Sequence, residues 1–183
     1  LMLYSAKDTD KIFQMVMGWD VDGVIAISFS KSNCEKIYQL INKPIVSIDA
    51  YGELDAGQEN HVLNIGLDDE SGGYLMTKYL LECGYEHIQV CAGRDNGVDH
   101  FRYMGAQRAA KEFAGKKQKV QFTALGMNYA KRKESYAWLI QRKKPKTALF
   151  FLSDLYALEA ISFFSSRGVK IPEEIGIAGY DNI

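Results

Sequence analysis

Residues 175–183 read IGIAGYDNI, a short apolar run that passes directly into a polar end at Asp181. The run predicts a β-strand, and the polar residues mark the point where it stops. Six predicted strands along the chain end in a small or acidic polar residue in this way, as residues 23–27 (GVIAI) do at Ser28. Ligands bind at the carboxyl ends of the strands in an open parallel sheet. The pattern therefore predicts a binding cleft lined by these residues.

Outward from this strand, short apolar runs alternate with helical patterns almost throughout the chain. The predicted strands are residues 1–5, 23–27, 45–48, 62–65, 88–92, 120–125, 149–152 and 175–178. The predicted helices are residues 8–18, 32–43, 71–83, 102–114, 131–143 and 154–167. Strand–helix–strand connections of this length imply parallel sheets with right-handed crossovers. The predicted fold class is α/β, with parallel sheets flanked by helices.

Two local features complete this pattern. Ser32 is followed three residues later by Glu35, which predicts a capping box at the start of a helix. A long polar stretch over residues 93–100 separates two series of alternating strands and helices. It predicts two lobes, residues 1–94 and 95–183, with a crevice between them.

Composition is that of a soluble globular protein rather than a disordered or membrane chain. The 183 residues are 47% hydrophobic and 25% charged, with a mean hydropathy of −0.20. The formal net charge of −1 gives no overall attraction to nucleic acid or to anionic lipid. The clusters of lysine and arginine lack interleaved aromatic residues, so they indicate solvated surface rather than a nucleic-acid site.

The three cysteines, Cys34, Cys83 and Cys91, have no CxxC spacing and lie in apolar surroundings. They predict reduced packing residues rather than disulfides or a zinc site. No signal peptide and no run of about 20 apolar residues is visible, so we expect a cytoplasmic protein without a membrane span. Because the chain begins inside one predicted strand and ends just after another, we expect that it is a piece of a longer protein.

Three charged residues and one aromatic residue have the chemistry to bind a small polyol. A carboxylate accepts hydrogen bonds from two adjacent hydroxyls, and an arginine fork donates in the complementary sense. Asp49, Asp181 and Arg102 supply this set, and Tyr129 could offer an aromatic face. An aspartate after a strand is also typical of a turn or helix cap, and a single tyrosine is often a packing residue. Arg102 at a predicted helix start is unfavourable for the helix dipole, which favours a specific role.

No catalytic arrangement is predicted. His61, His87 and His100 fall in unrelated segments, and there is no P-loop or GxGxxG motif. We expect no enzyme, no metal and no cofactor. The enzymatic alternative is a glycosidase that uses Asp49 and Asp181 as a carboxylate pair at a separation of about 5 to 9 Å.

Taken in order, several segments resemble the effector-binding domain of the LacI/GalR transcriptional regulators over nearly the whole chain. They are VDGVIAIS, KPIVSIDAY, GLDDESGGYLMTKYLLECGYEHIQVCAG, RYMGA, TALFFLSDLYALEA and GVKIPEEIGIAGYDN. The resemblance implies a two-lobed fold like that of periplasmic binding proteins, with a cleft for a small effector such as a sugar or a nucleobase-like metabolite. It also implies a homodimer that binds operator DNA through a helix-turn-helix head outside this chain. The first strand and helix of the first lobe and the segments after GYDN are expected to be missing as well.

The resemblance also assigns roles to individual residues. Arg102 matches the effector-binding arginine of R-x-x-G, Asp181 the effector-contacting aspartate of G-Y-D, and Asp49 the acid after the third strand. Asn96 falls in a loop that often contacts the ligand. Ser153 stands where relatives often have asparagine, so its contact with the ligand would be shorter and weaker. Tyr129 is assigned to the aromatic wall if one gap is allowed.

Three functions remain open from the sequence. The favoured one is the regulatory domain of a bacterial transcription factor. A solute-binding protein of a transport system would use the same cleft, and a signal peptide in place of a helix-turn-helix head would identify it. The glycosidase is the third, but the sequence offers no carboxyl group in an apolar pocket that would raise its pKa.

Overall fold

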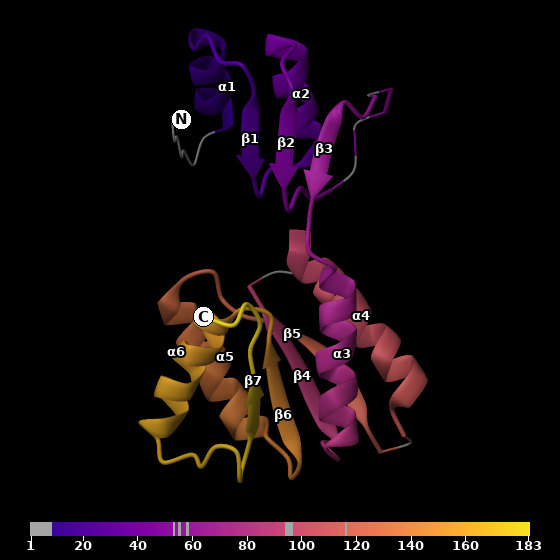
Figure 1. The fold of residues 1–183 in the computed structure, drawn as a ribbon. Coiled ribbons are helices and arrows are strands. Elements are labelled where there is room, and N and C mark those ends of the chain that lie inside the picture. The colour runs from indigo at the N-terminus through magenta and orange to yellow at the C-terminus, as the bar shows by residue number, and fades with distance from the viewer. Residues whose placement is uncertain (1–8, 53, 55, 58, 94–96, 116) are drawn as a thin grey trace. The chain divides into compact units, whose positions relative to one another are not determined.

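The computed structural model describes residues 9–52, 54, 56–57, 59–93, 97–115 and 117–183. The predicted strand over residues 1–5 lies outside them. The chain divides into two compact units, Leu1–Leu67 and Asp68–Ile183, and Figure 1 labels the elements of each.

The division falls earlier in the chain than the expected boundary between residues 94 and 95. The strand β4 (His87–Ala92) pairs with strands β5 (Lys119–Ala124) and β6 (Thr147–Phe151) of the second unit. The polar stretch that suggested a boundary thus lies inside that unit, and its residues 97–100 form the start of α4 (Gly97–Phe113).

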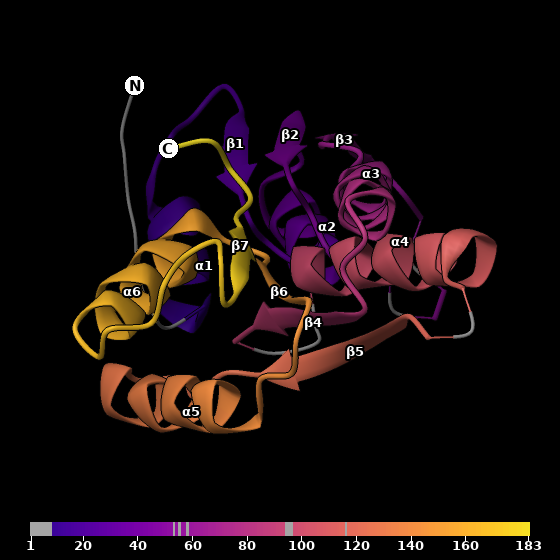
Figure 2. The same cartoon turned by 90° about the horizontal axis from the view of Figure 1, so that it is seen from below.

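The first unit is a three-stranded parallel sheet with helices on one face (Figures 1 and 2). Its elements are α1 (Thr9–Gly18), β1 (Val24–Ile27), α2 (Lys31–Ile41), β2 (Ile45–Ile48) and β3 (Val62–Ile65), and the strand order is β1-β2-β3. Its core centres on Val16 of α1, Ile37 of α2 and Ile45 of β2. Alternation along each strand directs every second side chain to this helix-covered face.

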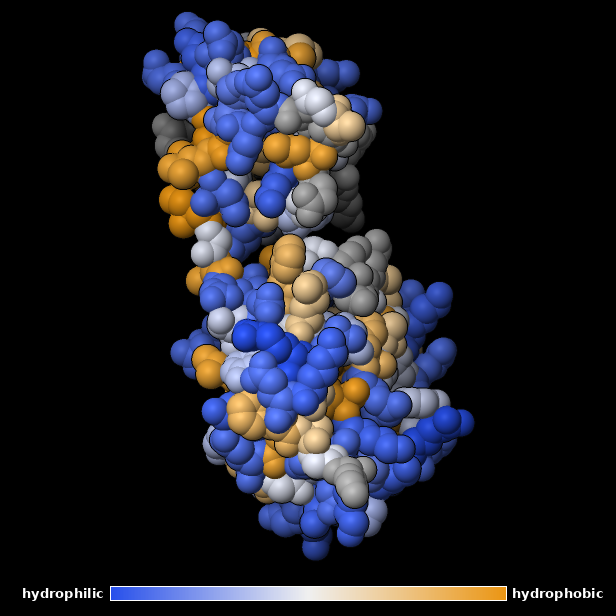
Figure 3. Space-filling view, turned by 90° about the vertical axis from the view of Figure 1, so that its right-hand side faces the viewer, coloured by the Kyte–Doolittle hydropathy of each residue, from blue (hydrophilic) through white to orange (hydrophobic). Residues whose placement is uncertain are grey.

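The opposite face of the same sheet is apolar and exposed. Its large hydrophobic residues are Ile25, Ile27, Ile48, Leu63 and Ile65, and Ile25 is 64% exposed. In Figure 3 hydrophobic residues gather along one side of the first unit. Parallel sheets are normally covered on both faces. Covering this exposed apolar face would therefore stabilise the first unit.

The second unit is a four-stranded parallel sheet between two layers of helices (Figure 2). Its other elements are α3 (Asp69–Glu82), α4 (Gly97–Phe113), α5 (Tyr129–Arg142), α6 (Asp154–Ser165) and β7 (Gly176–Ala178), and the strand order is β5-β4-β6-β7. Helices α3 and α4 cover one face, and α5 and α6 cover the other.

The central strand β6 shows why the sequence forms this sandwich. All five of its residues, TALFF, are buried. Leu149 and Phe151 pack with the residues of α5 and α6, whereas Ala148 and Phe150 pack with those of α3 and α4. A continuous apolar run is expected for a parallel strand that is buried on both faces.

The other predicted strands and the six predicted helices are confirmed within a few residues at their ends. The predicted capping box is wrong, because Ser30 rather than Ser32 caps α2 by accepting from the backbone N–H of Asn33. Glu35 is instead fully buried and accepts at 2.7 Å from Nδ1 of His61. Arg102 does not begin a helix, since α4 starts at Gly97.

None of the helices in the described part of the chain combines the length and apolar character that a membrane span requires. The same residues contain no group of three or more histidine, cysteine or acidic side chains that could hold a metal ion.

Candidate functional site

The candidate site lies at the carboxyl edge of the second unit's sheet and is built around Arg102 of α4. This arginine is buried, with 8% of its surface exposed. Its Nε donates to Oδ1 of Asp69 at 2.7 Å, and its Nη1 donates to the carbonyl oxygen of Leu152 at 2.5 Å. A buried charge is tolerated only when it is paired and hydrogen-bonded. Asp69, itself only 6% exposed, provides that pairing.

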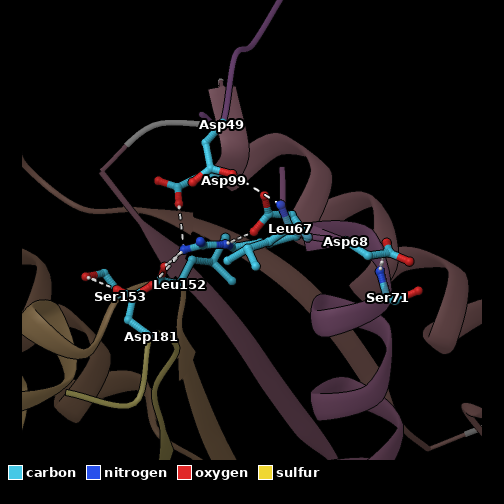
Figure 4. A network of polar contacts seen from close by, with 10 residues as sticks. Asp49, Leu67, Asp68, Ser71, Asp99, Leu152, Ser153 and Asp181 are labelled. Atoms are coloured by element: carbon cyan, nitrogen blue, oxygen red, sulfur yellow. Dashed lines mark hydrogen bonds and ion pairs between the residues drawn. The ribbon is translucent and has the colours of Figure 1, made fainter. Parts of the chain in front are cut away.

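Asp181 lies beside the same guanidinium, in the polar segment after β7. Its Oδ1 is 3.5 Å from Nη1 of Arg102, and its Oδ2 accepts from Oγ of Ser153 at 3.1 Å. Asp99, one helical turn before the arginine, has its Oδ1 4.0 Å from Nη1. Figure 4 shows Asp99, Leu152 and Asp181 converging on one point from three different segments.

Tyr180 covers one face of the guanidinium. The centroid of its ring lies 3.8 Å from Cζ of Arg102, within the range of a cation–π contact. Burial of the phenol raises the pKa of Tyr180, and the neighbouring carboxylate of Asp69 adds to the effect. The phenol of Tyr180 therefore stays neutral, and its ring packs against the guanidinium of Arg102.

Two glycines let α3 and α4 approach closely enough to bring Asp69 to Arg102. A Cβ at Gly73 would lie 1.9 Å from the carbonyl oxygen of Arg102, and a Cβ at Gly105 would lie 1.9 Å from that of Glu70. No side chain fits at either point. The pairing across α3 and α4 thus depends on small residues as much as on the charges themselves.

The strand ends of the first unit carry Ser28 and Asp49. Oδ1 of Asp49 accepts from the backbone N–H of Leu67 at 3.2 Å (Figure 4), and the N–H of Ser28 donates to the carbonyl of Ile48 at 2.9 Å. This contact joins Asp49 to the segment after β3, 18 positions along the chain, and is neither a helix cap nor a local turn contact. The hydrogen bond to Leu67 uses only Oδ1 of Asp49 and does not involve Oδ2.

Three of the predicted site residues have left-handed backbone conformations. The φ angles of Ser28, Asp49 and Asp181 are 53°, 52° and 105°. Such angles are unfavourable for residues other than glycine, and they concentrate at binding sites, where the surrounding fold maintains them. Each of the three follows a strand directly or closely, so the backbone turns sharply where the side chain is presented.

The remaining predicted site residues differ in where they lie. Ser153 is the N-cap residue of α6, and its hydroxyl donates to Asp181 instead of capping the helix. Tyr129 begins α5, is half exposed and has the ammonium of Lys133 4.9 Å from its ring centroid. The structure does not bring it into the contacts described for Arg102. Asn96 lies outside the described residues.

Sequence reasoning missed Asp69, Asp99 and Tyr180 as members of this site. One signal was available: Asp99 precedes Arg102 by three residues, a spacing at which side chains on a helix are neighbours. Asp69 gave no such signal, because it is separated from Arg102 by 33 positions and meets it only through the packing of two helices.

Comparison with known proteins identifies the family of the chain. Residues 77–183 match the family model of the periplasmic binding protein-like domain. The chain is 35% identical over 123 residues to the HTH-type transcriptional repressor PurR of Haemophilus influenzae, covering 64% of this chain and 36% of that protein. It is 30% identical over 178 residues to the protein of the same name from Pasteurella multocida, covering 93% of this chain and 50% of that protein. The chain thus spans half or less of the length of these two relatives.

Solved structures give the same fold. A LacI family transcriptional regulator from Enterococcus faecium with bound ribose matches with a TM-score of 0.76 and 21% identity, covering all of this chain and 66% of that one. A periplasmic binding protein/LacI transcriptional regulator from Alkaliphilus metalliredigens, complexed with D-xylulofuranose, matches with a TM-score of 0.73 and 25% identity, covering 96% and 63%. The predicted resemblance is confirmed, and the chain belongs to the family of periplasmic-binding-protein-like domains, in the form that LacI/GalR regulators use to bind effectors.

Proposed function

We propose that the chain is the ligand-binding regulatory domain of a transcriptional regulator, and that Arg102 and Asp181 bind a small polar effector, most simply a sugar. The observation that supports this most directly is their 3.5 Å separation at the carboxyl edge of one sheet. The arginine supplies donors and the aspartate supplies acceptors, which is the pair that adjacent hydroxyls require. The relatives named as repressors favour regulation over transport, and none of the proposed roles is catalytic.

Further residues complete the proposed site. Ser153 is proposed to bind the same ligand hydroxyl as Asp181, which its own hydroxyl contacts at 3.1 Å. Asp49 and Ser28 are proposed to contact the ligand from the first unit. Asn96 is proposed as a further contact, and Tyr129 as an aromatic contact.

Regulation then requires that the effector distinguish two arrangements of the protein. A ligand shifts an equilibrium only by its differential affinity for the two states. We propose that the two units change their arrangement on binding and that a helix-turn-helix head outside this chain responds, within a cytoplasmic homodimer. Two-fold symmetry of the dimer would match the palindromic operators that such heads bind.

Isothermal titration calorimetry with a panel of sugars and nucleobases tests the proposal. At least one compound is expected to bind, and Asp181→Asn or Arg102→Lys is expected to weaken it about tenfold or more, as loss of a hydrogen bond to a charged group does. Arg108→Ala is the matched control. Arg108 lies on the same helix, pairs with Glu70 at 3.0 Å and stacks on Tyr74, but has no place in the site.

Circular dichroism confirms that each variant is folded before its affinity is compared. Equal binding by wild type and both site variants would contradict the proposal. So would binding that Arg108→Ala weakens as much as Arg102→Lys does.

A further inference from the structure

Strand β5 forms one open edge of the second unit's sheet. The strand order β5-β4-β6-β7 leaves its outer side without a partner strand among the described residues, and Figure 2 shows it as the last strand of the sheet. The strand is six residues long, KVQFTA, and contains no proline. The opposite edge strand, β7, has only three residues. A long edge strand without proline is the kind that pairs with another chain.

The outward hydrogen-bonding groups of β5 follow from its pairing with β4. The N–H groups of Lys119 and Leu125 donate to the carbonyls of Glu86 and Ala92, at 2.8 and 2.7 Å. Successive peptide groups of a strand point to opposite sides, so the odd-numbered residues of this strand bond to β4. The N–H and C=O groups that point away from the sheet are those of Val120, Phe122 and Ala124.

A groove lies beside this edge, between β5 and α5. It has a volume of about 440 Å³ and is lined by residues 122–124 of β5 and by Glu134, Ser135 and Trp138 of α5. The side chain of Trp138 is exposed. Addition of a strand to a sheet edge uses main-chain hydrogen bonds for affinity and neighbouring pockets for side chains. The open edge and the groove together have both features.

Charge indicates which strand fits this edge. Lys119 at the start of β5 and Glu134 in the groove beside its end are both exposed, and neither has an ion-pair partner among the described residues. A strand that runs antiparallel to β5 has its own start beside the end of β5. A second copy of β5 in this orientation therefore brings its Lys119 to Glu134, and two-fold symmetry repeats the pair with the copies exchanged.

The register of such a pair is also self-complementary. With the two-fold axis at Phe122, this residue exchanges both N–H···O bonds with its own copy, and residue 120 does so with residue 124. Side chains of the odd-numbered residues share the sheet face of Leu125, which packs with residues of α5. Lys119 and Gln121 of one copy therefore lie on the groove side of the other.

We propose that two copies of the chain associate through β5, as antiparallel strands about a two-fold axis at Phe122, with Lys119 of each copy paired to Glu134 of the other. The two sheets then form one continuous sheet. This inference goes beyond the proposed function, because it concerns a surface apart from the effector site and does not depend on effector binding.

Amide hydrogen exchange of the whole chain, followed by NMR at several protein concentrations, tests the position of the contact. The N–H groups of Gln121 and Thr123 are bonded to β4 and should be protected at every concentration, so they are internal controls. Exchange at Val120, Phe122 and Ala124 should slow about tenfold or more only where sedimentation velocity shows association. Exchange at these three positions that is independent of concentration would overturn the inference.

A charge exchange tests the pairing of Lys119 with Glu134. Lys119→Glu and Glu134→Lys should each weaken association about tenfold or more, because like charges then meet on both sides of the axis. The double variant should associate within about threefold of wild type. Lys11→Glu makes the same charge change in the first unit and should leave association unchanged. A double variant as weak as the single variants would contradict the pairing.

Proline at Ala124 tests the hydrogen bonds of the edge. Ala124→Pro removes an N–H that points outward and leaves the bonds to β4 in place, so association should weaken about tenfold or more while circular dichroism is unchanged. Ala124→Ser keeps the N–H and should associate as wild type does. Equal association of Ala124→Pro and wild type would refute the inference, as would a wild-type chain that stays monomeric at about 1 mM.

Failure of this inference is distinguishable from failure of the proposed function. If copies associate without protection of the three outward amides, they meet at another surface, and the proposed homodimer stands. If no effector binds through Arg102 and Asp181, the proposed function fails, while the exchange and sedimentation results still decide the role of β5.

Discussion

Replacement of Asp69 by alanine removes the buried partner of Arg102. The guanidinium of Arg102 then stays buried without the carboxylate that compensates its charge. Both side chains are almost fully enclosed, and Nε of Arg102 loses its acceptor at 2.7 Å. Removing one member of a buried pair costs about 3–5 kcal/mol, mostly because the other charge stays buried without compensation. Leu152 and Asp181 remain as partners, so we expect a loss at the lower end, about 3 kcal/mol.

The two tryptophans allow the affected unit to be measured alone. Trp19 lies in the first unit and Trp138 in α5 of the second. In a Trp19→Phe background, urea unfolding followed by fluorescence reports on the second unit, which avoids treating a two-unit chain as one transition. Asp69→Ala should lower the urea midpoint of this transition without changing its slope.

A double-mutant cycle with Arg102→Met isolates the coupling between the two side chains. The exposed pair formed by Glu70 and Arg108 joins the same two helices at 3.0 Å and is the matched control. Exposed pairs contribute about 0.2–1 kcal/mol. We expect the cycle through Asp69 and Arg102 to give a clearly larger coupling energy. Coupling no larger than that of the exposed pair would refute the argument that burial makes this contact structurally decisive.

Three further predictions concern other parts of the molecule. The hydrogen bond to Glu35 raises the pKa of His61, although partial burial opposes it. The first unit should therefore lose stability as pH rises from about 6.5 through this raised pKa, and His61→Gln should abolish the dependence in urea unfolding. Native protein should react with Ellman's reagent at one thiol, that of Cys83, because burial raises the pKa of the other two; three should react in denaturant. Ile27→Thr with Ile65→Thr should reduce binding of the dye ANS to the exposed sheet face, with unchanged far-ultraviolet circular dichroism.

The strands were predictable because their apolar runs are short and bounded by glycine, proline or polar residues. The apolar run at residues 149–152, between Pro145 and Ser153, predicted a strand, and β6 covers Thr147–Phe151. Helix ends were less predictable, since several serines and aspartates compete as caps. Glu35 matched a capping motif in sequence, yet its side chain is hydrogen-bonded to His61, 26 positions away. Local patterns contain no information about such partners.

The candidate site likewise has features that the sequence predicted and features that it did not. That Arg102 and Asp181 meet was expected from resemblance to a family, and the structure places them 3.5 Å apart. Why the arginine is held there was not predictable, because it depends on how closely α3 and α4 pack. Gly73 and Gly105 set that distance, and each is recognisable as essential only once its neighbour in space is known. The position of the division between the units was missed for the same reason, since strand pairing rather than loop polarity determines it.

The two central residues of the site differ in how firmly the protein holds them, and this has a measurable consequence. Arg102 is fixed by Asp69, by the carbonyl of Leu152 and by the ring of Tyr180, so binding would not have to order it. Asp181 has 36% of its side chain exposed and is held by the longer contacts to Ser153 and Arg102. Asp181→Asn should therefore leave the free energy of unfolding within about 0.5 kcal/mol of wild type while weakening the binding of the effector. Arg102→Met should lower both the free energy of unfolding and the affinity for the effector. If Asp181→Asn instead destabilised the second unit as much as Arg102→Met, the aspartate would be part of the fold's support, and its role in binding would have to be argued from other contacts.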